Sequence, residues 1–210
     1  MKPGKEQGLL SDIQILERVV AEDQFCIFVS PLINPAVQLG PASLDLHLGG
    51  ELLTTKITST THIDLTQHKE VVGRQTSRYL ERESVEPHEA LVLHPNEFAL
   101  GGTVEFLRLP ADIAGRLEGR SSLGRIGLQI HATAGFVDPG FEGTLTFELI
   151  NAGKVPIKLR PGLRIGQICF FHTRDVQVGY MDKSVSKYGG KFSVEGSNIH
   201  DDPEILASED

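Results

Sequence analysis

The chain has 210 residues, of which 40% are hydrophobic and 23% charged, a size and composition typical of one folded globular domain. Its 20 basic and 28 acidic residues give a net charge of −8, which repels nucleic acid and argues against a nucleic-acid partner. No apolar run reaches the length of a membrane span, and residues 1–8 lack the apolar stretch of a secretory signal. We therefore expect a cytoplasmic protein with no membrane contact.

Cysteine and histidine residues are placed without the spacing of a metal site. The two cysteines, Cys26 and Cys169, lie far apart in apolar runs, so we expect buried thiols rather than a disulfide or metal ligands. The eight histidines form no His-x-x-x-His pair, and no Cys-x-x-Cys pair occurs. The sequence therefore predicts no zinc site.

The predicted elements begin with a helix and continue as strands. Segment 11–14 fits a capping box, and apolar residues recur at helical spacing from Ile13 to Val20, which predicts one short amphipathic helix. Hydrophobic and polar residues then alternate over 43–48, 126–131, 144–149 and 155–159, the pattern of half-buried strands. Turn signals at 138–140 and 151–153 follow at short intervals, so we expect a mainly β fold of the sandwich or barrel type.

Two stretches depart from this regular pattern. Residues 58–86 are polar with weak periodicity and are expected to form a long excursion from the core. Residues 184–210 are rich in glycine, serine and acids, so we expect a mobile tail unless a ligand or a neighbouring subunit orders it. The predicted organisation is one β domain over 1–183 and a flexible tail over 184–210 that is a possible active-site lid.

The segment Gly119–Arg125 is the most informative motif. Arg120 and Arg125 flank the hydroxyls of Ser121 and Ser122 at an expected strand-to-helix turn, where unpaired backbone N–H groups and guanidinium groups would suit a polyphosphate. Between positions 108 and 125, four arginines against two acids give a local charge of +2 in an acidic chain. The alternative interpretation is a solvated basic turn with a serine cap.

A second motif spans residues 131–143 and is rich in small residues. These permit close approach of a flat ligand to the backbone, and Phe136 offers it an apolar face. Asp138 could hold a metal-bound or attacking water. A tight hairpin turn that begins at Asp138 explains the same residues without a ligand.

Glu148 lies in the middle of a predicted strand, between Phe147 and Leu149 and on the face shared by Thr144 and Thr146. A carboxylate at such a position would be half desolvated and could act as a general base. The alternative is an edge-strand glutamate that faces solvent.

Taken together, these motifs resemble the dCTP deaminase branch of the dUTPase superfamily. Their order and spacing agree with that branch over nearly the whole chain. The matching segments are 10–12, 38–49, 119–125, 133–141, 147–149, 160–162 and 164–167, with Tyr180 and 186–188.

The resemblance implies a distorted jelly-roll-like β fold of the dUTPase type, with a short N-terminal helix and a flexible C-terminal tail. It further implies a homotrimer with active sites at the subunit interfaces. The ligands would be dCTP and dUTP, with magnesium carried in on the triphosphate and no zinc. In agreement, the combined His-x-Glu and Pro-Cys-x-x-Cys signature of zinc-dependent nucleobase deaminases is missing, because the sequence has no Pro-Cys-x-x-Cys.

The resemblance also assigns roles to residues. Glu148 would deprotonate the water that attacks cytosine C4 and pass the proton toward the leaving ammonia. The phosphates would be held, and the catalytic water ordered, by Arg120, Ser121, Ser122 and Arg125, with Arg125 also supporting the tetrahedral intermediate. Asp138 would contact the deoxyribose, and Thr146 and Phe147 would contact the base. The remaining nucleotide-binding residues would be Arg120, Ser121, Ser122, Leu123, Gly124, Arg125, Gln167, Tyr180, Lys187 and Lys191, the last at a position where this branch usually has glutamine.

The pair Gly135 and Phe136 bears on the product. In this branch, strict deaminases that release dUTP tend to have His-Arg after Thr-Ala, whereas the forms that also cleave the triphosphate to dUMP have Gly-Phe or Gly-Trp. The pair here favours a dUMP-forming enzyme. A deaminase that releases dUTP, a dUTPase without deaminase activity and a non-enzymatic nucleotide sensor or trimeric scaffold remain as alternatives.

Overall fold

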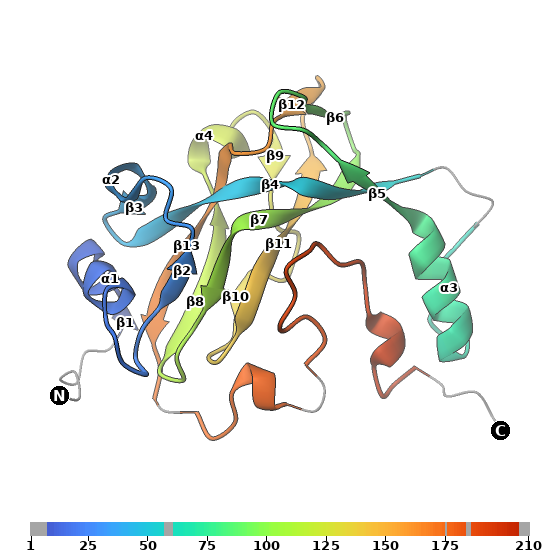
Figure 1. Ribbon diagram of the computed structural model, residues 1–210. Helices are drawn as coiled ribbons and strands as arrows, with labels where there is room; N and C mark the ends of the chain where they lie inside the picture. Colours follow the sequence, from blue (N-terminus) through green and yellow to red (C-terminus); the bar gives the residue numbers. More distant parts are fainter. Residues whose placement is uncertain (1–7, 57–60, 175, 184–185, 206–210) are drawn as a thin grey trace.

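The computed structural model describes residues 8–56, 61–174, 176–183 and 186–205, and strands dominate it (Figure 1). The prediction of a mainly β fold with a short N-terminal helix is confirmed. The elements are, in chain order, β1 (Gly8–Leu9), α1 (Asp12–Val19), β2 (Phe28–Ser30), α2 (Pro35–Gln38), β3 (Leu39–Gly40), β4 (Ser43–Thr55), α3 (Lys69–Tyr79), β5 (Leu80–Ser84), β6 (Leu91–Leu93), β7 (Phe98–Arg108), β8 (Ile113–Gly119), α4 (Ser121–Gly124), β9 (Leu128–Gln129), β10 (Phe136–Val137), β11 (Glu142–Asn151), β12 (Ile157–Leu159), β13 (Arg164–His172), and the 3-10 turns η1 (Tyr180–Asp182) and η2 (Ile199–Asp201).

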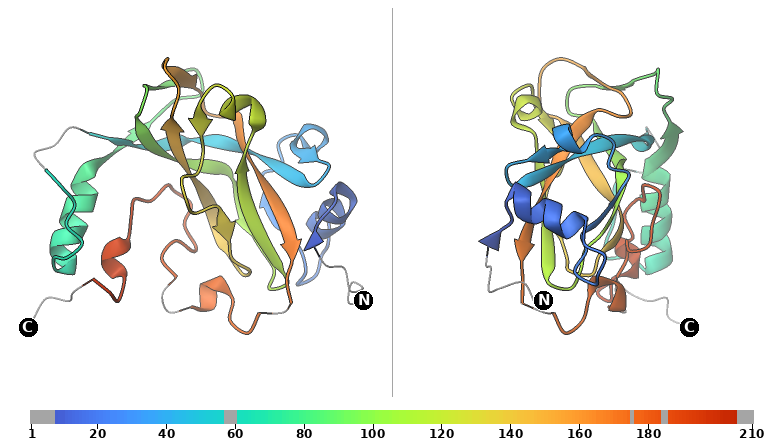
Figure 2. Two further views of the ribbon diagram at one scale, coloured as in Figure 1. Left: turned by 180° about the vertical axis from the view of Figure 1, so that it is seen from behind. Right: turned by 60° about the vertical axis from the view of Figure 1, so that its left-hand side comes forward.

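One curled antiparallel sheet forms most of the molecule, as the views in Figure 2 show. Within the described residues it has 11 strands, and its main path runs β10-β8-β13-β4-β7-β11-β9. The long strand β4 pairs with β13 through its first half and with β7 and β5 through its second half, and its register on β7 shifts between Leu48 and Leu52. Because one strand joins both halves, the sheet curls around a single core.

Alternating residues of the long strands fill that core. Leu44 and Leu46 of β4, Phe147 of β11 and Phe170 of β13 are almost completely buried, as expected where every second side chain of a strand points inward. The side chains between them point to the other face. This alternation is what brings Thr144, Thr146 and Glu148 to a common surface of β11.

The helix α1 begins as predicted, although its apolar stripe is not the buried one. Ser11 Oγ accepts a hydrogen bond from the Gln14 backbone N–H, and the Gln14 side chain accepts one from Ser11 N at 2.8 Å, which completes the capping box. Ile15 is fully buried, whereas Ile13 and Leu16 are exposed. The helical spacing therefore predicted the helix correctly, but it did not predict which of its residues pack against the core.

The other predicted elements agree with the structure in part. Of the alternation at 126–131, only Leu128–Gln129 forms a strand, β9; Leu128 and Ile130 are buried as predicted, whereas Ile126 is exposed. The excursion at 58–86 contains the helix α3 and the strand β5, where residues are described, and Val72 of α3 is fully buried. The weak hydrophobic pattern there did not predict this helix.

Residues 186–205 of the predicted tail contact the domain. Val194 is buried with Leu53 and Leu100, and its carbonyl oxygen accepts a hydrogen bond from Arg82 Nη2 at 2.9 Å. The Phe192 ring stacks on the Phe106 ring with centroids 5.0 Å apart. Figure 1 shows this segment, in red, between β11 and α3. Residues 184–185 and 206–210 of the predicted tail lie outside the described residues.

The cysteines are less buried than the sequence indicated. Cys26 and Cys169 are free thiols of intermediate exposure, so the prediction of buried thiols needs correction. Cys26 lies in the segment before β2, and Cys169 lies within β13, opposite Arg116 of β8. Across the described residues, no helix is both long enough and apolar enough to span a membrane.

Candidate active site

Glu148 is held in one orientation by the backbone of a neighbouring loop. Its Oε2 atom accepts hydrogen bonds from the Ala132 N–H at 2.6 Å and the Thr133 N–H at 3.3 Å. The strand position is fixed as well, because Glu148 N donates to the Ile130 carbonyl oxygen at 2.9 Å and the residue pairs with Leu100 of β7. The carboxylate is half-buried, and it keeps a second oxygen for which no protein donor is found among the described residues.

Glu148 lines a cavity whose volume is about 690 Å³. Cavities of this size commonly hold small-molecule ligands. Strand β11 contributes Thr144, Thr146 and Glu148, strand β10 contributes Phe136, and the loop before β10 contributes Ala134. A second, apolar wall comes from α3 and the ends of β5 and β7, and the tail closes one side. The predicted polar face of β11 therefore does line a cavity, which Thr144, Thr146 and Glu148 all border.

Asp138 borders the same cavity and lies in a solvated position. Its side chain is 40% exposed, and its Oδ2 atom lies 3.9 Å from Lys183 Nζ. The turn reading of this segment is also correct, since Phe141 N donates to the Asp138 carbonyl oxygen. A carboxylate in such a turn is free to contact both solvent and a ligand in the cavity.

Gly135 and Phe136 have different roles in the cavity wall. A Cβ atom built on Gly135 would lie 2.9 Å from the Leu117 carbonyl oxygen, so a larger residue would displace this loop. Phe136 is 65% exposed and lines the cavity, where its ring is available to a ligand. Small size at 135 is thus required by the close approach of two backbone segments.

Phe147 points away from this cavity. Its side chain is fully buried, and it packs against Gly166 on the core face of β11. Alternation along a strand places it opposite Thr146 and Glu148. If Phe147 contacts the nucleobase as predicted, it can do so only through its main-chain groups.

The Arg120–Arg125 loop lies outside the Glu148 cavity. The loop follows β8 and forms the single turn α4, and none of its residues lines the cavity wall. Arg120 Nη1 donates to the Arg164 carbonyl oxygen at 2.9 Å, and Arg120 Nε lies 3.5 Å from Asp45 Oδ2. In contrast, Ser121, Ser122, Gly124 and Arg125 are exposed, and Leu123 packs partly against the core. One chain thus brings the base and the candidate phosphate loop to separate surfaces.

Residues of the predicted lid are divided between the cavity and other partners. Tyr180 lines the cavity, and its hydroxyl oxygen accepts a hydrogen bond from Tyr188 N at 3.2 Å. Lys187 forms an ion pair with Asp202, and Lys191 uses its carbonyl oxygen to accept from Thr144 N at 3.0 Å. The tail is tied to β11 next to the cavity, while both lysine side chains lie off its wall.

Gln167 lies beside the 120–125 loop and does not line the cavity. Its Oε1 atom accepts from Ser43 Oγ at 2.9 Å, and its Nε2 atom donates to the Gly119 carbonyl oxygen at 3.3 Å. Because Gly119 directly precedes Arg120, Gln167 supports the base of that loop.

The comparison with known proteins places the chain in a family. The model of the dCTP deaminase-like family matches residues 9–173. The chain belongs to the dCTP deaminase-like family. It is 39% identical to a dCTP deaminase of Natronomonas pharaonis over 94% of this chain and 97% of that protein. It is 38% identical to a dUMP-forming dCTP deaminase of Methanobrevibacter smithii over 94% of this chain and 98% of that protein, and 45% identical to one of Bifidobacterium adolescentis over 78% of each.

A solved structure shares the family's fold. The 2'-deoxycytidine 5'-triphosphate deaminase of Agrobacterium tumefaciens matches with a TM-score of 0.59 and 24% identity, over 80% of this chain. The chain matches 49% of the length of that deaminase. The likeness supports the curled β architecture, and the sequence resemblance to the dCTP deaminase branch is confirmed by the family match.

The sequence motifs did not predict the groups that hold Arg120 and Glu148 in place. Asp45 and the main chain of Arg164 contact Arg120, and two loop amides bind Glu148. The signal for Asp45 was present, because it stands on the polar side of the alternation between Leu44 and Leu46. The amide donors carry no side-chain signal at all, since any residue type supplies a backbone N–H.

Proposed function

We propose that this protein is a dCTP deaminase that converts dCTP and water to a uracil nucleotide and ammonia. The observation that carries the proposal is the Glu148 carboxylate, which is fixed by two backbone N–H groups in a nucleotide-sized cavity. A family match over residues 9–173 and relatives that are named dCTP deaminases over nearly their full length support the same reaction.

Glu148 is the general base of the proposed reaction. One carboxylate oxygen is held by Ala132 and Thr133, and the other accepts the proton of a water. The water oxygen bonds to cytosine C4, the proton is passed to the exocyclic nitrogen, and the C4–N4 bond breaks to release ammonia. A base that is positioned within hydrogen-bond reach accelerates such a transfer by about 10²- to 10⁴-fold.

The base and sugar of the nucleotide are proposed to lie along β11. Thr146 offers a hydroxyl beside Glu148, and the main chain at Phe147 offers its peptide groups. Asp138 contacts the deoxyribose, and Tyr180 closes the same side of the cavity. This arrangement would let a cytosine ring lie flat over β11 with its C4 atom next to the Glu148 carboxylate.

The triphosphate is proposed to bind the loop at 120–125. Guanidinium groups match phosphate oxygens in geometry and charge, and the exposed Ser121 and Ser122 hydroxyls can donate to the same oxygens. Ser121 and Arg125 would also order the attacking water, and Arg125 would support the tetrahedral intermediate. Gln167, Lys187 and Lys191 would complete the contacts to the phosphates, for which the two lysine side chains must turn toward the nucleotide.

Because the loop and the Glu148 cavity occupy separate surfaces of one chain, we propose that a second copy completes each site. A closed assembly that repeats one heterologous interface can bring the loop of one copy to the cavity of the next. A homotrimer of this kind satisfies the proposal with three equivalent sites. It also explains why a loop with two arginines and two hydroxyls is left exposed in the isolated chain.

Magnesium is proposed to arrive with the nucleotide. Where the chain is described, no cluster of three or more His, Cys, Asp or Glu residues could hold a metal ion, and the loop at 120–125 contains no acid. This donor set fits Mg²⁺ that is bound by triphosphate oxygens and water, as is common for this ion. The bound ion would neutralise phosphate charge, and the chain's own residues would orient the phosphates.

The proposed end product is dUMP, formed by a second hydrolysis that releases pyrophosphate. The Gly135–Phe136 pair is the one expected of dUMP-forming enzymes, and Asp138 on the cavity wall would face the water that attacks the α-phosphate. Relatives that are named dUMP-forming, from Methanobrevibacter smithii and Bifidobacterium adolescentis, support this product.

The test is product analysis of the purified protein with dCTP and Mg²⁺. Phosphorus NMR distinguishes dUTP from dUMP with pyrophosphate, and an enzymatic assay measures ammonia. We expect ammonia and pyrophosphate in equal amounts. Ammonia without pyrophosphate identifies a deaminase that releases dUTP, and pyrophosphate from dUTP without ammonia from dCTP identifies a dUTPase. If neither ammonia nor pyrophosphate forms from dCTP or from dUTP, the proposed function is wrong.

A further inference from the structure

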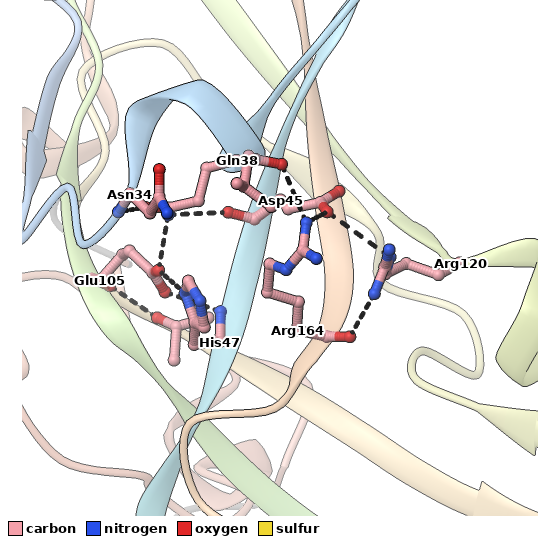
Figure 3. A network of polar contacts seen from close by, with 9 residues as sticks. Asn34, Gln38, Asp45, His47, Glu105, Arg120 and Arg164 are labelled. Atoms are coloured by element: carbon pink, nitrogen blue, oxygen red, sulfur yellow. Dashed lines mark hydrogen bonds and ion pairs between the residues drawn. The ribbon is translucent and has the colours of Figure 1, made fainter.

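A carboxylate outside the proposed catalytic groups ties the phosphate loop to the sheet. Asp45 of β4 accepts a hydrogen bond at its Oδ2 atom from Arg164 Nη1 at 2.8 Å, and Arg120 Nε lies 3.5 Å from the same oxygen. Arg120 Nη1 also donates to the Arg164 carbonyl oxygen at 2.9 Å. Figure 3 shows the three side chains converging from three segments of the chain.

The Asp45 carboxylate is the most buried member of this group. Its side chain is 13% exposed, against 28% for Arg164 and 32% for Arg120. Its position is fixed by the strand pairing of β4 with β13, in which Asp45 stands opposite Gln167. The Arg164 side chain is fixed a second time, because Nη1 also donates to the Val37 carbonyl oxygen at 2.8 Å. The carboxylate is therefore a rigid point for Arg120.

The two loop arginines differ in a way that this anchor explains. Arg120 has a carboxylate and a carbonyl oxygen as partners, whereas Arg125 is exposed and has no side-chain partner within the described ranges. The three charged groups of the anchor leave one positive charge over, since two guanidinium groups share one carboxylate. The anchor thus fixes the direction of Arg120 without cancelling its attraction for an anion.

We infer that Asp45 is a positioning residue for triphosphate binding, which holds the Arg120 guanidinium in the orientation that meets the phosphates. The inference rests on the proposed function, which supplies the triphosphate. A preorganised guanidinium loses less side-chain entropy when it binds a phosphate than a free one does. A hydrogen bond between charged groups is also strongly dependent on direction.

Charge alone predicts the opposite effect of removing Asp45. A neutral residue at this position would make the loop more positive and so strengthen the attraction for a triphosphate. Loss of the anchor would instead let Arg120 turn away and weaken binding. The sign of the change in dCTP affinity therefore separates positioning from simple neutralisation.

The experiment compares Glu148→Gln, which is expected to bind dCTP without converting it, with Glu148→Gln/Asp45→Asn by calorimetric titration with dCTP and dCMP in the presence of Mg²⁺. All further variants of this comparison are made in the same Glu148→Gln background. We expect dCTP to bind about tenfold more weakly to Asp45→Asn, the range for loss of one hydrogen bond to a charged group. The affinity for dCMP should change less than about twofold, because the β- and γ-phosphates are absent from it. A merely structural role would weaken both ligands equally, and that result would overturn the inference.

The matched control is Glu51→Gln, which lies on the same strand. Glu51 Oε2 also pairs with an arginine, Arg82 Nη1 at 3.0 Å, on an exposed surface away from the phosphate loop. Both variants replace an acid by its amide in an arginine pair on β4, so the control measures the general cost of such a change. We expect the dCTP to dCMP preference of Glu51→Gln to equal that of Glu148→Gln alone.

A double-variant cycle tests whether Asp45 acts through Arg120. In an Arg120→Gln background, Asp45→Asn should change dCTP affinity less than about twofold, because the group that it positions is gone. A full tenfold loss in that background would overturn the inference, and so would tighter dCTP binding by Asp45→Asn alone.

Arg120→Lys provides a variant that leaves Asp45 and its Arg164 pair in place. It keeps the positive charge and removes the two-point contact of the guanidinium group, so we expect about tenfold weaker dCTP binding. Unchanged affinity would overturn the inference even if Asp45→Asn does not fold. Failure of the proposed function is a separate outcome, since the unmodified protein would then release no ammonia from dCTP, whatever the variants bind.

Discussion

The two halves of the proposed site are prepared to different extents within one chain. Glu148 lies in a cavity, and two backbone N–H groups fix its carboxylate. The loop at 120–125 is largely exposed and lies outside that cavity, and its Arg120 side chain is held by Asp45 and the Arg164 carbonyl oxygen. The proposed general base, Glu148, is thus positioned by contacts within one chain. The proposed phosphate-binding groups of the 120–125 loop lie on a different surface of that chain.

This difference has a physical reason. A general base has to be held within a hydrogen-bond distance of its proton, so its support must be rigid before the substrate arrives. Phosphate binding depends more on charge, which acts over a longer range and tolerates a side chain that adjusts. The buried anchor on Arg120 and the free Arg125 combine both modes in one short loop.

The largest expected effect comes from removing the base. Glu148→Gln keeps the shape of the side chain and an oxygen for the Ala132 and Thr133 amides, but it cannot accept a proton from water. We expect ammonia release from dCTP to fall by about 10³-fold, with dCTP affinity nearly unchanged. Coupled-enzyme measurement of ammonia and calorimetric titration test the two parts.

Glu142→Gln is the matched control for that variant, because Glu142 lies on the same face of β11 and outside the cavity. It should deaminate dCTP at the normal rate. Normal ammonia release by Glu148→Gln would remove the proposed base and with it the contrast between the two halves.

The second prediction tests whether the two halves come from different copies. Glu148→Gln and Arg125→Met should each be nearly inactive alone. If a site combines Glu148 of one copy with the loop of another, mixed assemblies of the two variants regain intact sites, at about a quarter of all sites for random mixing in equal amounts. Measurement of dCTP deamination after joint refolding or co-expression detects this recovery.

Two inactive variants that stay inactive after mixing would show that both halves act within one chain. The control is the same mixture without subunit exchange, which should have no activity. A sedimentation measurement of the unmodified protein checks the trimer independently.

A smaller effect is expected from the loop that carries the amide donors. In Gly135→Ala the new Cβ atom would meet the Leu117 carbonyl oxygen at 2.9 Å, and the backbone here is also tied by the Leu117 N–H to the Gly135 carbonyl oxygen at 2.7 Å. The loop must shift, and the amides that hold Glu148 would shift with it. We expect roughly a ten- to hundredfold lower kcat, with pyrophosphate formation affected at least as much as ammonia formation.

Gly102→Ala is the control for the added methyl group, since its Cβ atom would make only ordinary contacts, with Val194 at 3.8 Å. Its kcat should stay within about twofold of the normal value. Equal rates for Gly135→Ala and the unmodified protein would show that the loop is not held as tightly as the close approach indicates.

The parts of this structure that follow from local pattern could be predicted from the sequence. Alternation predicted β4 and β11, and the capping box predicted the start of α1. The same alternation placed Glu148 beside Thr146, because residues two apart on a strand share a face. Nothing local shows that Ala132 and Thr133 would supply donors to Glu148, or that α3 would form within a polar stretch. Those features depend on which distant segments meet.

The least effect is expected at Cys169, which contrasts with the exposed loop because its surroundings are partly closed to water. Burial within β13, together with the nearby negative charge of Glu118, raises the pKa of the Cys169 thiol above its ordinary value, and Arg116 offsets this in part. Since the thiolate is the reactive form, alkylation of Cys169 should begin at higher pH than alkylation of a model thiol. Iodoacetamide labelling of a Cys26→Ser variant, followed by mass spectrometry across pH 7 to 10, measures this directly. In a Glu118→Gln variant the nearby negative charge is gone, so the labelling midpoint should move to lower pH, while burial should still hold it above that of the model thiol. A midpoint at or below that of the model thiol in the parent variant would show that water reaches the Cys169 thiol freely.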